Sequence, residues 1–164
     1  MTRAERVLEM ILSDGEGPVE VAAPVVTKMP EPKENMVALW RKAVAAGDAA
    51  LAACTPTPMI VTEHANPLDD NSAPVKKWFV SGGVCGFAEV RVPYKGKGIA
   101  FINAMKKAGM AGERKAWSKH YHGGYYYWVS VGGQSMQLKE AWARAAAEVL
   151  CAAGIDAWMT SRMD

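Results

Sequence analysis

The chain has 164 residues, 50% of them hydrophobic and 22% charged, so it has the length of one domain and enough apolar side chains to bury a core. This composition excludes a wholly disordered chain, and no uncharged apolar run reaches the roughly 18 residues needed to span a bilayer. The net charge of +2 hides an asymmetry: residues 1–74 carry six basic and eleven acidic side chains, whereas residues 75–164 carry thirteen and six.

The first third of the chain is predicted to be an arm. Thr2 and Glu5 have the spacing of a capping box and predict a helix that ends at Gly15. Residues 18–33 contain four prolines and indicate an extended linker.

A second helix is predicted from about residue 34 to residue 46. Its apolar spacing turns Trp40 inward, and Gly47 is expected to end it. Residues 66–74, rich in Pro, Asp and Asn, indicate another linker. We therefore expect two regions, an acidic helical arm over 1–74 and a basic domain over 75–164.

The basic half alternates strands and helices. The patterns predict strands at 77–80, 87–92, 125–131 and 155–159, and helices at 99–107 and 135–153. Ser135 is placed to cap the longest helix, on which Lys139 is expected outside the apolar stripe. The order ββαβαβ predicts an α+β class with a two-layer domain: a four-stranded sheet with two helices on one face, preceded by a loosely packed helical N-terminal region.

Several short motifs follow one another in this half. They include Cys85-Gly86-Phe87-Ala88, Lys106-Lys107-Ala108-Gly109, Gly133-Gln134-Ser135, Lys139-Glu140-Ala141 and Ser161-Arg162-Met163-Asp164. In order and spacing they resemble a family of small, uncharacterised tailed-phage proteins, in which a Trp stands at the position of Glu89. The resemblance implies expression inside an infected bacterium and supplies no catalytic residues.

A basic segment followed by an aromatic strand indicates a nucleic-acid interface, because cations suit phosphates and flat rings suit bases. The candidate residues are Lys106, Lys107, Arg114, Lys115, Trp117, Lys119, His120, Tyr121, His122, Tyr126 and Trp128. Strand alternation puts Tyr126 and Trp128 on the face away from Tyr125 and Tyr127. The alternative is a solvated basic loop whose aromatic side chains belong to the core.

A glycine pair between a strand and a helix is a second candidate, for anion binding. The residues are Gly132, Gly133, Gln134 and Ser135, and their amides would lie at the positive end of the helix dipole. The alternative is a plain turn followed by a helix cap.

The sequence gives little indication of a metal site or a catalytic site. His120 and His122 lack a third ligand at metal-site spacing, so no metal and no cofactor are expected. Glu89 and Arg91 share a strand face and could form an ion pair. No nucleophile with a positioned base is evident, which favours a non-enzymatic role.

The cysteines and the first residues indicate where in the cell the protein is located. Cys54, Cys85 and Cys151 have no Cys-x-x-Cys spacing and are expected to be reduced. The charged start argues against a signal peptide. We expect a cytoplasmic protein without a membrane partner.

The leading hypothesis is a non-enzymatic phage accessory protein that binds nucleic acid, single-stranded in preference, through the basic loop and the aromatic strand. The alternative is a protein-binding module that captures a host or phage protein, with Trp40 and the acidic helices in the contact. An enzyme acting on a nucleotide or nucleic acid is the third hypothesis.

Overall fold

The structure, a computed structural model, describes residues 35–164; the helix expected after Thr2 and the linker over 18–33 lie outside this range. The described elements are α2 (Met36–Ala53), β1 (Met59–His64), β2 (Pro74–Val80), β3 (Gly86–Val92), α3 (Lys97–Lys107), β4 (Trp117–Lys119), β5 (Tyr125–Trp128), α4 (Met136–Ala152) and β6 (Trp158–Met163). None of the helices in this range is long and apolar enough to cross a membrane.

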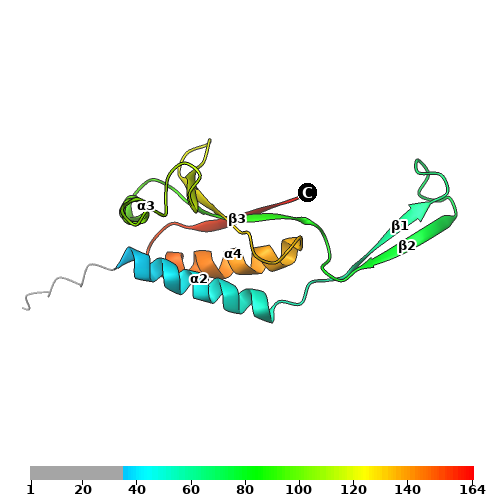
Figure 1. Cartoon of the computed structure of the whole chain (residues 1–164), viewed down its shortest axis with the longest axis horizontal. Helices are drawn as coiled ribbons and strands as arrows, with labels where there is room; N and C mark the ends of the chain where they lie inside the picture. The colour runs from blue at the N-terminus through cyan, green and yellow to red at the C-terminus, as the bar shows by residue number, and fades with distance from the viewer. Residues whose placement is uncertain (1–34) are drawn as a thin grey trace, which may run out of the picture. The chain divides into compact units, whose positions relative to one another are not determined.

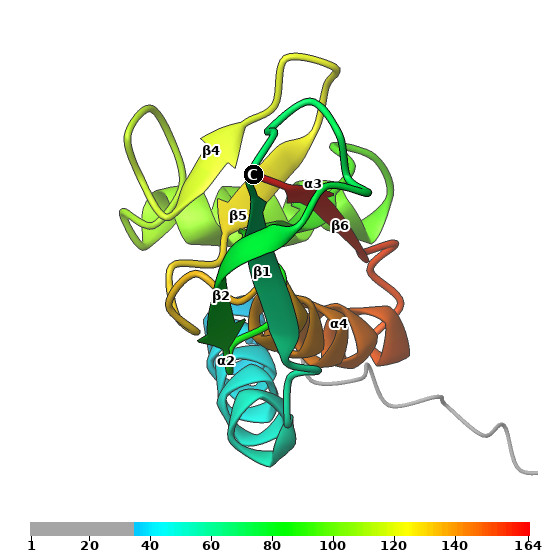
Figure 2. The ribbon, with the colours of Figure 1, turned by 90° about the vertical axis from the view of Figure 1, so that its right-hand side faces the viewer.

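The main sheet has four antiparallel strands in the order β4-β5-β3-β6. Helices α2 and α4 pack against each other and cover one face of this sheet, as Figures 1 and 2 show. The α+β class and the four-stranded sheet are therefore confirmed. The opposite face, which we call the open face, carries no helix in the described part of the chain.

Two strands differ from the prediction. The strand expected at 77–80 is β2, which pairs with β1 in a separate hairpin instead of joining the main sheet. Its expected place is taken by β4, a three-residue strand within a segment predicted to be a loop. β4 has only three residues and ends at Lys119, so its sequence contains no alternation of apolar and polar side chains from which a strand could be predicted.

A cluster of aromatic side chains lies between the helices and the sheet. Trp40 of α2 is 2% exposed, and its ring centroid lies 4.9 Å from that of Trp117 and 4.8 Å from that of Tyr127. Trp142 of α4 stacks on Tyr127 at 5.4 Å, and Phe101 of α3 packs on Trp117. Helix α2, which the sequence placed in the arm before residue 75, is thus part of this core, and Trp40 is not a surface contact residue.

Helix α2 continues through Gly47, which was expected to end it. A Cβ on Gly47 would lie 2.6 Å from Cε2 of Trp142, so only glycine lets the two helices approach this closely. The neighbouring Asp48 accepts a 2.8 Å hydrogen bond from Nε1 of the same indole. Packing between the helices therefore outweighs the low helix propensity of glycine.

Helix α4 begins as predicted, with the Ser135 side chain accepting a hydrogen bond from the amide of Leu138. Its buried stripe differs from the prediction, because Lys139 lies inside it at 6% exposure. The Lys139 ammonium donates a 2.7 Å hydrogen bond to the carbonyl of Gly86, at the start of β3. A buried amine satisfied by a backbone oxygen explains why a charged residue faces the sheet.

Candidate functional site

Strand β3 divides its side chains between the two faces of the main sheet. Ala88, Val90 and Val92 are almost completely buried under the helices. Phe87, Glu89 and Arg91 therefore point to the open face.

The register of the neighbouring strands places polar and aromatic side chains beside these three residues. Arg91 lies between Tyr126 and Trp158, Glu89 lies between Trp128 and Thr160, and Phe87 lies opposite Arg162. Together they form rows across three strands that are far apart in the sequence.

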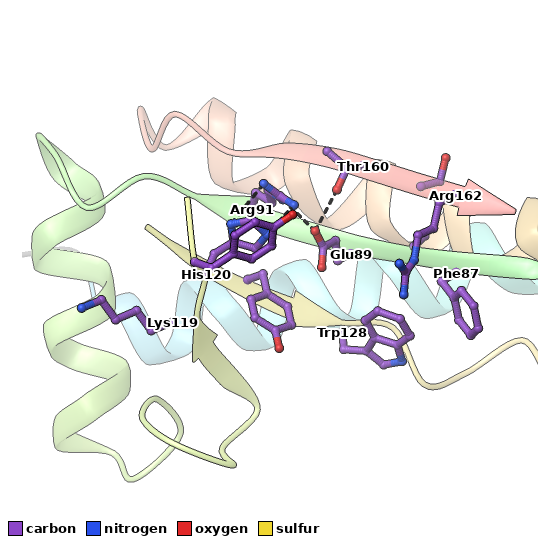
Figure 3. A pocket seen from close by; sticks show the side chains of 12 residues that line it. Phe87, Glu89, Arg91, Lys119, His120, Trp128, Thr160 and Arg162 are labelled. Carbon is purple, nitrogen blue, oxygen red and sulfur yellow. Dashed lines mark hydrogen bonds and ion pairs between the residues drawn. The ribbon is translucent and has the colours of Figure 1, made fainter. Parts of the chain in front are cut away.

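These residues, apart from Trp158, line a groove of about 410 Å³, which we call the open-face groove (Figure 3). Lys119, His120 and Tyr121, from β4 and the turn after it, close one end of the groove. Arg162 and Phe87 lie together beyond Trp128 in Figure 3. The groove therefore carries cationic side chains at both ends and aromatic rings between them.

A hydrogen-bonded network fixes the middle of the groove. Arg91 Nε donates to Glu89 Oε1 at 2.7 Å, and Thr160 Oγ1 donates to the same oxygen at 3.0 Å. The ion pair expected between Glu89 and Arg91 is thus confirmed, and it is partly buried. Arg91 Nη2 lies 2.7 Å from Nε2 of His120. Because a guanidinium only donates, Nε2 faces a donor, and Nδ1 also faces one, the backbone amide of His122 at 3.1 Å.

His120 is 6% exposed, and it lines the groove as part of its wall. Burial lowers the pKa of its imidazole, and the positive charge of Arg91 lowers it further. The ring is therefore held in its neutral form, so it adds no cation to the groove at neutral pH.

The groove keeps an excess of positive charge. Within residues 35–164 the ion pairs are Arg91 with Glu89 and Lys95 with Asp156. Neither Lys119 nor Arg162 is paired with an acidic side chain of that part of the chain, and both remain exposed. The ionised lining residues, three basic and one acidic, sum to +2.

The aromatic rings are partly accessible. Trp128 is 38% exposed, and its ring centroid lies 5.1 Å from that of Phe87 with a tilt of 39°. The guanidinium carbon of Arg162 lies 5.3 Å from the centre of the Phe87 ring. Rings beside cations can take a flat, electron-rich group by stacking and an attached anion by charge.

The structure brings together only part of the predicted interface. Lys119, His120, Tyr121, Tyr126 and Trp128 all line the open-face groove. Tyr127 packs in the core, so the predicted alternation along β5 is confirmed for this strand.

The remaining basic residues lie outside the groove. Lys106 and Lys107 form the last turn of α3, and the Lys106 ammonium lies 5.0 Å from the Tyr94 ring. Arg114 lines a second depression beside β4, and Lys115 is exposed in the same loop. His122 is exposed, and its ring centroid lies 4.0 Å from that of Tyr121.

Trp117 was wrongly assigned to the interface. Its side chain is fully buried between Trp40 and Phe101, where no ligand reaches it. A three-residue strand is too short for its sequence pattern to show which side chain faces inward.

The glycine pair before α4 forms a turn and a cap. Gly132 and Gly133 have φ of 86° and 60°, and Ser135 caps the helix. The amide of Met136 donates to Val84, and that of Leu138 donates to Ser135. The amide of Ser135 also donates to the carbonyl of Gly132, so these bonds describe a turn followed by a helix cap, which was the alternative to the anion site expected at residues 132–135.

The groove also contains residues that the sequence did not indicate as a site. Phe87, Thr160 and Arg162 come from β3 and β6, which the register brings beside β5. Phe87 and Arg162 belong to two of the short motifs noted in the sequence, Cys85-Gly86-Phe87-Ala88 and Ser161-Arg162-Met163-Asp164, which is the one signal that could have pointed to them.

No group of three or more His, Cys, Asp and Glu side chains that could hold a metal is found among residues 35–164. The three cysteines are unbridged. Desolvation, followed by the hydrogen bond to Asp164, raises the pKa of the Cys85 thiol, which disfavours a reactive thiolate there.

Comparison of the chain with known protein families, with curated proteins and with solved structures found no match.

Proposed function

We propose that the open-face groove binds single-stranded nucleic acid. The observation that carries the proposal is the juxtaposition of Trp128 and Phe87 with Arg162 in one groove, with Lys119 at its other end. Stacking on exposed rings is tolerant of base identity and contributes about 1–3 kcal/mol for each base. Lys119 and Arg162 supply the charge that a phosphate backbone requires.

Single strands fit this arrangement better than duplexes. Bases in a duplex are already stacked on each other, so rings lying on a sheet surface can reach only unpaired bases. Within residues 35–164, no helix or protruding ribbon that could enter a major groove lines the open-face groove.

The proposal includes a biological setting and a kind of activity. The motifs that resemble tailed-phage proteins support a role inside an infected bacterium, as a non-enzymatic accessory protein. The groove offers cations, rings and a neutral histidine already hydrogen-bonded to Arg91, which suits binding more than bond cleavage.

The test is fluorescence anisotropy with labelled single- and double-stranded DNA and RNA of the same sequence, at two salt concentrations. Trp128→Ala should weaken single-strand binding by about tenfold to a hundredfold, the equivalent of one lost base stack. Its matched control is Tyr94→Ala, which removes a ring of comparable exposure, 45%, outside the groove.

Charge reversal gives the second arm of the test. Arg162→Glu should flatten the slope of log affinity against log salt by about 0.7 or more, since at least one phosphate contact is lost. Arg144→Glu, an exposed change on α4, is the control and should have little effect. If the unmodified protein binds no oligonucleotide in a salt-dependent manner, the proposal is wrong and the protein-binding alternative replaces it.

A further inference from the structure

The hairpin of β1 and β2 exposes apolar side chains on both of its faces. On one face Ile60 and Phe79 lie directly opposite each other and are 65% and 71% exposed. On the other face Val61 lies opposite Trp78, and both are also exposed. Adjacent apolar side chains of this size on a surface mark a contact site.

The hairpin also has open backbone edges. Among residues 35–164, β1 pairs only with β2 and β2 only with β1. A two-stranded hairpin is marginally stable in water by itself, and an open edge is a template for another strand. Both properties predict that a further strand joins the hairpin.

The two edges differ in how well they are protected. Strand β2 begins at Pro74 and carries Lys76 and Lys77, which are the devices that block pairing at an edge. Strand β1 contains neither proline nor lysine, and Glu63 is its one acidic residue. A new strand therefore meets less resistance at β1.

We propose that a second copy of this chain pairs with the β1 edge. Antiparallel pairing about a two-fold axis at Val61 would place Val61 against Val61 of the second copy. It would place Ile60 opposite Thr62 and Met59 opposite Glu63, so that no like charges meet. The result is a four-stranded sheet in the order β2-β1-β1-β2, with Trp78 at each end of its central row.

The symmetry of this contact supports the choice of a second copy. Pairing of β1 with β1 is isologous and closes as a dimer, whereas pairing of β1 with β2 is head-to-tail and continues indefinitely. Two-fold pairing through β2, centred on its middle residue, would oppose Lys77 with Lys77. The β1 contact is therefore closed and free of charge repulsion.

The experiment is sedimentation velocity on the full chain over a range of concentrations. We expect a dimer, and we expect Val61→Lys to raise its dissociation constant by about a hundredfold or more, because two lysines would meet at the axis. Val75→Lys is the matched control: Val75 is 67% exposed on the protected strand, and the change should leave the dimer intact.

A charge-swapped pair separates loss of the contact from loss of folding. Val61→Lys and Val61→Glu chains should each be monomeric alone and should form a heterodimer when mixed. A wild-type chain that stays monomeric to high micromolar concentration would refute the proposal and leave a different protein as the occupant of the edge. A dimer that survives Val61→Lys would refute it equally.

Discussion

Replacing Gly47 by alanine is expected to destabilise this protein, although the same change in most helices is stabilising. A helical Gly→Ala substitution normally gains about 1 kcal/mol. Here the new Cβ would lie 2.6–2.8 Å from three atoms of the Trp142 indole, closer than van der Waals contact allows.

The indole has little freedom to move away. Trp142 is 2% exposed and stacks on Tyr127, and its Nε1 donates to Asp48 at 2.8 Å. Overpacking costs about 1–3 kcal/mol, and loss of the hydrogen bond costs about 1 kcal/mol more. After the gain in propensity is subtracted, we expect Gly47→Ala to lower the free energy of unfolding by about 1–3 kcal/mol.

The assay is urea unfolding followed by circular dichroism. Ala45→Gly, an exposed change in the same helix, is the control that measures propensity alone, and it should cost about 1 kcal/mol. A Gly47→Ala protein as stable as the wild type, or more stable, would show that the contact between α2 and α4 is not the reason for the glycine.

Three further outcomes are expected. Lys139→Met should lower the free energy of unfolding in urea by about 1–3 kcal/mol, because it leaves the Gly86 carbonyl without its donor. Its control, Arg144→Met on the exposed side of the same helix, should change that free energy by less than about 0.5 kcal/mol. Glu89→Gln should strengthen single-strand binding by about twofold to fivefold and steepen its salt dependence, since the groove loses its carboxylate; weaker binding would contradict this. The pKa of His120 is lower in the folded chain than in the unfolded chain, so the unfolded chain binds more protons at acid pH. The free energy of unfolding should therefore be highest above pH about 6.5 and should decrease as pH falls through the folded-state pKa. His120→Gln should reduce this decrease when unfolding is measured at several pH values.

The elements that the sequence predicted well have strong local patterns. Strand β3 alternates apolar and polar side chains, and α4 has a capping serine followed by an apolar stripe around Trp142. The orientation of Tyr126 and Trp128 followed from the same period of two. In each case the neighbouring residues along the chain decide the structure.

The predictions that failed depend on partners distant in the sequence. Gly47 stays helical because of Trp142, nearly a hundred residues away, and Lys139 is buried because the Gly86 carbonyl receives it. β2 pairs with β1 and not with the main sheet, and the sequence of neither strand shows which partner it takes. Half of the groove was missed for the same reason: Arg162 is beside Phe87 only in the folded sheet.

The two ends of the segment that contains the hairpin meet where it leaves and rejoins the rest of the fold. Gln137 of α4 accepts a hydrogen bond from the amide of Thr57, and a Cβ on Gly83 would collide with the carbonyl oxygen of the same threonine. Residues 58–82 therefore form an excursion whose ends are held together, and the entropic cost of closing it rises only slowly with its length. That segment could therefore be lengthened, replaced or removed without changing how the strands of the main sheet are connected. The surface of the hairpin can diverge in sequence while the open-face groove is kept.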